Sequence, residues 1–82
     1  MAFVYILRST INEITYVGST LDMELRLREH NSGKNVFTRR HRPWRVVYQE
    51  KFEILGQARA REKYLKSAAG RRWLKVNNII PR

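Results

Sequence analysis

The sequence contains no cysteine, which excludes disulfides and thiolate metal sites. Acidic residues are scarce, with 7 Asp and Glu against 17 Lys and Arg, and the formal net charge is +10. Long apolar runs are also absent, and the apolar start of the chain is broken at Arg8, which argues against a membrane span or a signal sequence. We therefore expect one domain, residues 1–82, located in the cytoplasm and without a membrane partner.

The positive charge is spread along the chain rather than confined to a tail. A basic surface can serve solubility alone. A balance this one-sided in so small a domain instead favours an acidic polymer as the partner. Nucleic acid is the commonest such polymer, so it is the first class of ligand to consider.

The hydrophobic pattern predicts three strands. Residues 3–7 and 14–18 are apolar, rich in β-forming side chains and joined by a short polar loop, as in a hairpin. Both faces of the first run are apolar, so it should be central in its sheet, with Tyr5 inside the molecule. Residues 44–52 have the composition of a third strand. With helices between and after these strands, the expected fold is α/β of the α+β type, a three-stranded antiparallel sheet flanked by helices.

Spacing and capping residues predict the helices. Residues 22–32 begin with acidic side chains, which favour the positive end of a helix, and end before Gly33, a good C-terminal cap. From Leu55 onward apolar residues recur at helical spacing, and Gly70 is expected to interrupt the pattern before it resumes. Glu62 lies on the same apolar stripe, where a carboxylate is costly unless it is paired. It is the most informative acidic residue of the chain.

A set of chemically suited residues occurs in one order along the chain. The set consists of Tyr5, the tripeptide Tyr16-Val17-Gly18, Arg26, His30 and Glu62. This order and spacing resemble the GIY-YIG nuclease superfamily, and the segments RLREHNSGK and AREKYLK resemble its small single-domain bacterial branch. The first tripeptide keeps only its tyrosine, with Phe3 and Val4 where the family name has Gly and Ile. Asn77 and Asn78 are the candidates for the late asparagine that members often have.

The resemblance implies a role for each residue. It implies that Glu62 binds Mg²⁺, for which Mn²⁺ could substitute. Tyr5 would act as the general base and Tyr16 would orient the water or a phosphate oxygen. Arg26 would stabilise the phosphate, and His30, one helical turn later, would assist proton transfer. A free phenol has a pKa of about 10, so a base role for Tyr5 requires nearby cations or a metal.

Each of these residues also has an ordinary structural interpretation. Glu62 can pair with a surface arginine such as Arg59 or Arg61. The tyrosines can be half-buried strand residues that satisfy a hydroxyl. Arg26 can be a solvated helix arginine, and His30 a satisfied histidine at a helix end. The residues taken alone leave these alternatives open.

Residues 33–43 show no periodicity and predict a basic loop that binds nucleic acid. Its cations could contact phosphates, and its aromatic side chains could stack on unpaired bases. The candidate residues of this loop and the position after it are Lys34, Phe37, Arg39, Arg40, His41, Arg42 and Trp44. A solvated run of charges is the simpler interpretation of the same loop.

These residues and the resemblance predict a metal-dependent DNA endonuclease that hydrolyses phosphodiester bonds with little sequence specificity. Single-stranded or branched DNA is the expected substrate, RNA is an alternative polymer, and DNA repair is the expected setting. Two other functions stay open. One is a nucleic-acid-binding module that keeps the fold without the activity, and the other is an interaction subunit of a repair complex.

Overall fold

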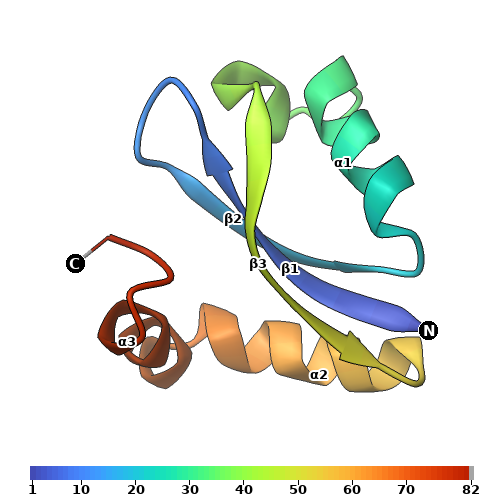
Figure 1. The fold of residues 1–82 in the computed structure, drawn as a ribbon, viewed down its shortest axis with the longest axis vertical. Coiled ribbons are helices and arrows are strands. Elements are labelled where there is room, and N and C mark those ends of the chain that lie inside the picture. The colour runs from blue at the N-terminus through green and yellow to red at the C-terminus, as the bar shows by residue number, and fades with distance from the viewer. Residues whose placement is uncertain (82) are drawn as a thin grey trace.

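The computed structural model describes residues 1–81 as a three-stranded sheet with helices on both faces (Figure 1). The strand order is β2-β1-β3 and both pairings are antiparallel, which confirms the expected sheet with the first strand at its centre. The elements are, in chain order, β1 (Ala2–Ser9), β2 (Thr15–Thr20), α1 (Met23–Ser32), the 3₁₀ helix η1 (Thr38–His41), β3 (Trp44–Phe52), α2 (Leu55–Lys66) and α3 (Ala68–Val76).

Strand β1 is buried on both faces because its side chains belong to two separate cores. Val4 and Ile6 pack with Leu65 and other residues of the C-terminal helices. Tyr5 and Leu7 point to the opposite face and pack beneath α1. Figure 1 shows α1 on one side of the sheet and α2 with α3 on the other. The sheet therefore separates two groups of side chains, which matters for the site.

Helix α1 begins and ends where its capping residues predict. The Asp22 side chain accepts a hydrogen bond from the backbone N–H of Leu25 at 3.0 Å. Gly33 takes a φ of 93°, a left-handed conformation that glycine adopts without strain, and its N–H donates to the Glu29 carbonyl oxygen. These two caps fix the length of the helix that carries Arg26 and the buried His30.

The C-terminal helical region breaks at Ser67 and not at Gly70, so the predicted position of the interruption is wrong. The Ser67 side chain caps α3 by accepting a hydrogen bond from the Gly70 N–H at 3.2 Å. Gly70 is buried inside α3, at a point where a Cβ would overlap the carbonyl oxygen of Tyr64. The glycine thus allows α3 to approach the end of α2. Within residues 1–81, none of the helices has the length and apolar character that crossing a bilayer requires.

Candidate active site

The five residues of the expected catalytic set come from both faces of the sheet and approach one another around the free edge of β2. Tyr5, Arg26 and His30 lie on the side of α1. Glu62 comes from α2 on the other face, and the Ser19 hydroxyl of β2 donates a hydrogen bond to its Oε1 at 2.5 Å. Strand β2 has no neighbour on its outer side, so groups from both faces can meet a ligand there. The two halves are joined through Lys66 and Tyr16. Lys66 Nζ lies 2.5 Å from Glu62 Oε2 and 6.0 Å from the centroid of the Tyr16 ring, and that ring lies 5.0 Å from the ring of His30.

Gly18 explains how the Tyr5 side chain fits against the sheet. Tyr5 and Gly18 are direct partners across β1 and β2. A Cβ at Gly18 would overlap the hydroxyl and Cζ of Tyr5. The glycine of the Tyr-Val-Gly tripeptide therefore creates the space for the first tyrosine. The second, Tyr16, is only partly buried, and its ring centroid lies 6.4 Å from that of Tyr5.

The Tyr5 hydroxyl has two hydrogen-bond partners on α1. The Nε of Arg26 donates to it at 3.3 Å, and the Nε2 of His30 lies 2.9 Å from it. Because a guanidinium has no acceptor, a neutral phenol gives its proton to His30 Nε2. The hydrogen of the neutral imidazole is then on Nδ1, which donates to the Thr38 hydroxyl at 2.7 Å. These contacts fix one tautomer of His30.

Burial determines the protonation of both rings. It raises the pKa of Tyr5 to about 12, and the hydrogen bond and charge of Arg26 offset only part of that rise. It lowers the pKa of His30 to about 4, with a further contribution from the positive charge of Arg26. At neutral pH Tyr5 is therefore a phenol and His30 a neutral imidazole. The neighbouring arginine alone does not ionise Tyr5, so a base role depends on His30 as the proton acceptor.

Arg26 can bind an anion while it keeps its hydrogen bond to Tyr5. Its Nε is used by the Tyr5 hydroxyl, and one terminal nitrogen donates to Glu29 Oε1 at 3.3 Å. One third of its side chain is exposed. The hydrogen bond to Tyr5 is the main cause that raises the pKa of Arg26, so its positive charge is permanent. The remaining N–H donors can therefore bind a phosphate.

Glu62 is hydrogen-bonded to a serine and a lysine, and the charge of Arg59, one of the expected surface partners, also helps to lower its pKa. Lys66 Nζ lies 2.5 Å from its Oε2, one helical turn away. Arg61, one of the expected surface partners, pairs instead with Glu50 at 2.8 Å. Burial pushes the pKa of Glu62 upward, but the hydrogen bonds from Lys66 and Ser19 outweigh it and keep the pKa below its usual value. The carboxylate is therefore ionised at neutral pH.

The donor chemistry around Glu62 fits a magnesium ion. Mg²⁺ prefers oxygen ligands, keeps several waters, and often binds through one or two carboxylates together with substrate phosphates. Glu62 and the Ser19 hydroxyl supply such oxygens. No group of three or more His, Cys, Asp or Glu suited to a metal occurs among residues 1–81. Because Glu62 supplies one carboxylate, the site suits an ion shared with the substrate, and Lys66 would have to leave Oε2 to admit it.

The basic loop is exposed as expected, but Trp44 is not part of that surface. Trp44 is 3% exposed and its Nε1 donates to the Thr38 carbonyl oxygen at 2.7 Å. The expectation that Trp44 stacks on bases is wrong, because the first side chain of β3 fills the core beneath α1. Phe37 is 53% exposed and His41 is partly buried. The exposed cations of the loop are Lys34, Arg39, Arg40 and Arg42.

Three polar residues that support the site were not predicted from the sequence. Thr38 orients His30, and Ser19 and Lys66 hold Glu62. Only Lys66 has a visible signal, its position four residues after Glu62 on the same helix. Thr38 and Ser19 meet their partners through long-range packing, which local spacing does not reveal.

The two late asparagines lie at the end of α3. The Asn77 side chain donates to the Trp73 carbonyl oxygen at 2.8 Å, and its backbone ends the helix. Asn78 has a φ of 59°, a conformation that asparagine tolerates better than most residues. Both therefore have a structural role, and their part in the site stays a prediction.

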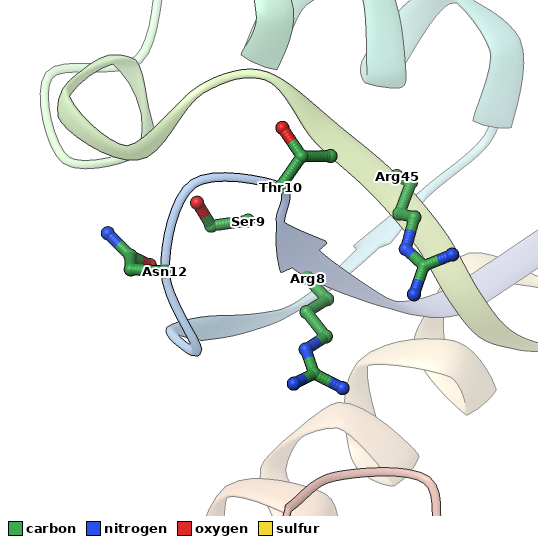
Figure 2. A pocket seen from close by; sticks show the side chains of 5 residues that line it. All are labelled: Arg8, Ser9, Thr10, Asn12 and Arg45. Carbon is green, nitrogen blue, oxygen red and sulfur yellow. The ribbon is translucent and has the colours of Figure 1, made fainter.

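A basic hollow of about 420 Å³ lies at the hairpin end of the sheet (Figure 2). Arg8 and Arg45 are direct partners across β1 and β3, and like charges so placed repel each other. Arg8 has one distant ion pair, with the exposed Glu13 at 3.7 Å, and no described acidic residue pairs with Arg45. An anion would relieve this repulsion. The residues that line the hollow are Arg8, Ser9, Thr10, Asn12 and Arg45.

The chain resembles known proteins along most of its length. It is 36% identical over 75 residues to a UPF0213 protein of Staphylococcus haemolyticus, which covers 90% of each chain. It is 40% identical over 67 residues to a UPF0213 protein of Clostridium perfringens, covering 80% of this chain and 71% of the relative. A third UPF0213 protein, from Haloquadratum walsbyi, is 39% identical over 66 residues, or 79% of this chain and 73% of that protein. No solved structure matches the chain.

A family model described as the GIY-YIG catalytic domain matches residues 1–76. This range includes the whole of the sheet, all three α-helices and each of the five residues at the edge of β2. The resemblance that the tyrosines, arginine, histidine and glutamate indicate is thereby confirmed. The chain belongs to the GIY-YIG family.

Proposed function

We propose that this protein is a metal-dependent endonuclease that hydrolyses phosphodiester bonds in DNA. The observation that carries this proposal is that an ionised carboxylate, Glu62, is joined through Lys66 and Tyr16 to the Tyr5–His30–Arg26 group at one strand edge. The family supports a nuclease with a nucleic-acid substrate. The net charge of +10 favours the same polyanion.

Tyr5 and His30 would transfer the proton of the attacking water. As the Tyr5 oxygen takes that proton, its own proton passes to His30 Nε2 across 2.9 Å. Positive charge then appears on His30 while negative charge develops on the phosphate, so the two changes offset each other. Thr38 accepts the hydrogen bond from Nδ1 throughout and keeps the ring in place.

Arg26 and Glu62 would act on the phosphate from either side of the strand edge. The free N–H groups of Arg26 donate to its non-bridging oxygens, and Tyr16 orients the water or a phosphate oxygen. Glu62, with the Ser19 hydroxyl, would hold Mg²⁺ or Mn²⁺, which when bound supplies Lewis-acid stabilisation worth several kcal/mol. Lys66, once displaced from the carboxylate, would be free to pair with a substrate phosphate.

The substrate we propose is single-stranded or branched DNA in the cytoplasm, in a repair process, with RNA as an alternative polymer. The exposed cations of the basic loop and the Arg8–Arg45 pair supply contacts to phosphates. Such contacts fix the position of a nucleic acid but carry no base information. Weak sequence specificity follows from this distribution.

Cleavage of end-labelled single-stranded, duplex and branched DNA tests the proposal. Each DNA is incubated with Mg²⁺ or Mn²⁺ and either the wild type, Glu62→Gln or the control Glu50→Gln, a partly buried glutamate of β3 that pairs with Arg61. We expect the wild type and Glu50→Gln to cut. Glu62→Gln should bind equally well and cut at least about 100-fold more slowly, because the metal carboxylate is lost. Binding of all three proteins without any cleavage would instead establish a binding module.

A further inference from the structure

We propose that a hollow along the outer edge of β2 binds one unpaired nucleobase of the DNA strand beside the cleaved phosphate. The hollow measures about 280 Å³, just below the range of about 300–1,000 Å³ typical of small-molecule sites, which suits one base better than a base pair. This proposal rests on the proposed function for the position of the cleaved phosphate. The residues that line the hollow are Thr15, Tyr16, Val17, Phe37, Lys66 and Arg71.

Two aromatic rings form one wall of this base site. The ring centroids of Tyr16 and Phe37 are 6.0 Å apart with planes inclined by 34°, a direct aromatic contact. The Phe37 ring also lies 5.8 Å from the ring of His41. A base therefore has no room between Tyr16 and Phe37 and would lie against the part of the Phe37 ring that lines the hollow. The fold leaves this large apolar ring about half exposed. Stacking of a base on such a ring is worth about 1–3 kcal/mol.

Two cations, Lys66 and Arg71, line the base site on the side of the C-terminal helices. Lys66 Nζ lies 6.0 Å from the centroid of the Tyr16 ring. Arg71, near the start of α3, is exposed and forms no ion pair with any residue of the described chain. Cations beside a stacked base can bind the phosphates that flank it.

Lys66 also connects the base site to the proposed metal carboxylate. It bonds to Glu62 at 2.5 Å and lines a neighbouring hollow together with Arg59, Glu62 and Lys63. Lys66 lines both hollows, so a base in the base site and a phosphate at Glu62 would lie on either side of this side chain and would belong to adjacent nucleotides. A base inside a duplex is stacked on both faces and must leave the helix to enter such a pocket. The base site consequently favours DNA with an unpaired nucleotide at the cleaved position.

The test measures binding separately from cleavage by placing every variant in the Glu62→Gln background. The probe is a DNA junction with one unpaired 2-aminopurine, compared with the same junction in which that position is abasic. We expect Glu62→Gln to bind the base-containing junction about fivefold or more tightly than the abasic one, with a change in 2-aminopurine fluorescence. Phe37→Leu should remove this preference and Phe37→Trp should restore it.

Arg39→Ala is the matched control for charge. Arg39 is an exposed loop cation that lines neither the base site nor the neighbouring hollow that shares Phe37, so its loss should weaken binding of both junctions by the same factor. Equal affinity of Glu62→Gln for the two junctions, or a preference that survives Phe37→Leu, would overturn the proposal. If the preference is present but the wild type cuts no DNA, the catalytic proposal fails while base binding stands.

Discussion

The hydroxyl of Tyr5 and Nε2 of His30 lie 2.9 Å apart, and both side chains are completely buried. One residue belongs to the central strand and the other to the last turn of α1, so the contact joins the sheet to the helix. Burial keeps both rings neutral by raising the pKa of Tyr5 and lowering that of His30. The same hydrogen bond that stabilises the fold is therefore the path for the proton in the proposed reaction.

Tyr5→Phe removes this path without changing the shape of the core. We expect single-turnover cleavage to fall by about 100- to 10,000-fold, the usual contribution of a general base. The free energy of unfolding should drop by about 1–3 kcal/mol, because His30 and Arg26 each lose a buried partner. Urea unfolding and DNA binding serve as controls. A rate close to that of the wild type would show that Tyr5 is not the base.

The lowered pKa of His30 predicts sensitivity to mild acid. A histidine titrates near 6.5 when unfolded and His30 near 4 when folded, so between these values the unfolded chain binds more protons. The free energy of unfolding should therefore fall as the pH falls, by about 2 kcal/mol between pH 7 and pH 5. Urea unfolding at each pH measures this slope. His30→Asn should flatten it, and an equally steep slope in that variant would assign it to other groups.

Gly18→Ala places a methyl group against the Tyr5 ring. Overpacking of this kind costs about 1–3 kcal/mol, and it should also disturb the contact between Tyr5 and His30. Gly56→Ala is the matched control, since Gly56 has open space and lies in helix α2. Its free energy of unfolding should stay the same or rise by up to about 1 kcal/mol. Equal stability of the two variants would contradict the packing that we describe.

Arg45→Ala tests the hollow shown in Figure 2 as a phosphate contact. DNA affinity should fall by a similar factor for all sequences, and the slope of log K against log salt should decrease by about 1. Arg28→Ala, on an exposed position of α1, removes the same charge from another surface. If both variants lose affinity and slope equally, net charge rather than the hollow determines binding.

Local chemistry was sufficient to predict much of this fold. The caps Asp22 and Gly33 define α1 through contacts with their own helix. The third strand covers residues 44–52 as predicted, and the apolar character of both faces identifies the central strand. These features depend on neighbours within a few residues, which a single sequence contains.

The errors concern contacts between distant segments. Trp44 points into the core because it pairs with Ser9 in a register that shifts between Ile6 and Leu7. Nothing near residue 44 encodes that shift. Gly70 resembles a helix interruption, but its place is set by the approach of α3 to α2. The site itself was predictable only in its residue types, because its two halves meet around a strand edge.

The most direct test of the account is single-turnover cleavage by the wild type, Tyr5→Phe, Glu62→Gln and the double variant, at saturating Mn²⁺ and a DNA concentration at which all four bind. Residues that act in one catalytic site give strongly non-additive losses. We predict that each single variant loses most of the activity and that the double variant is no slower than the slower single variant. Losses that multiply in the double variant, or cleavage that survives Glu62→Gln, would contradict a single site at the edge of β2.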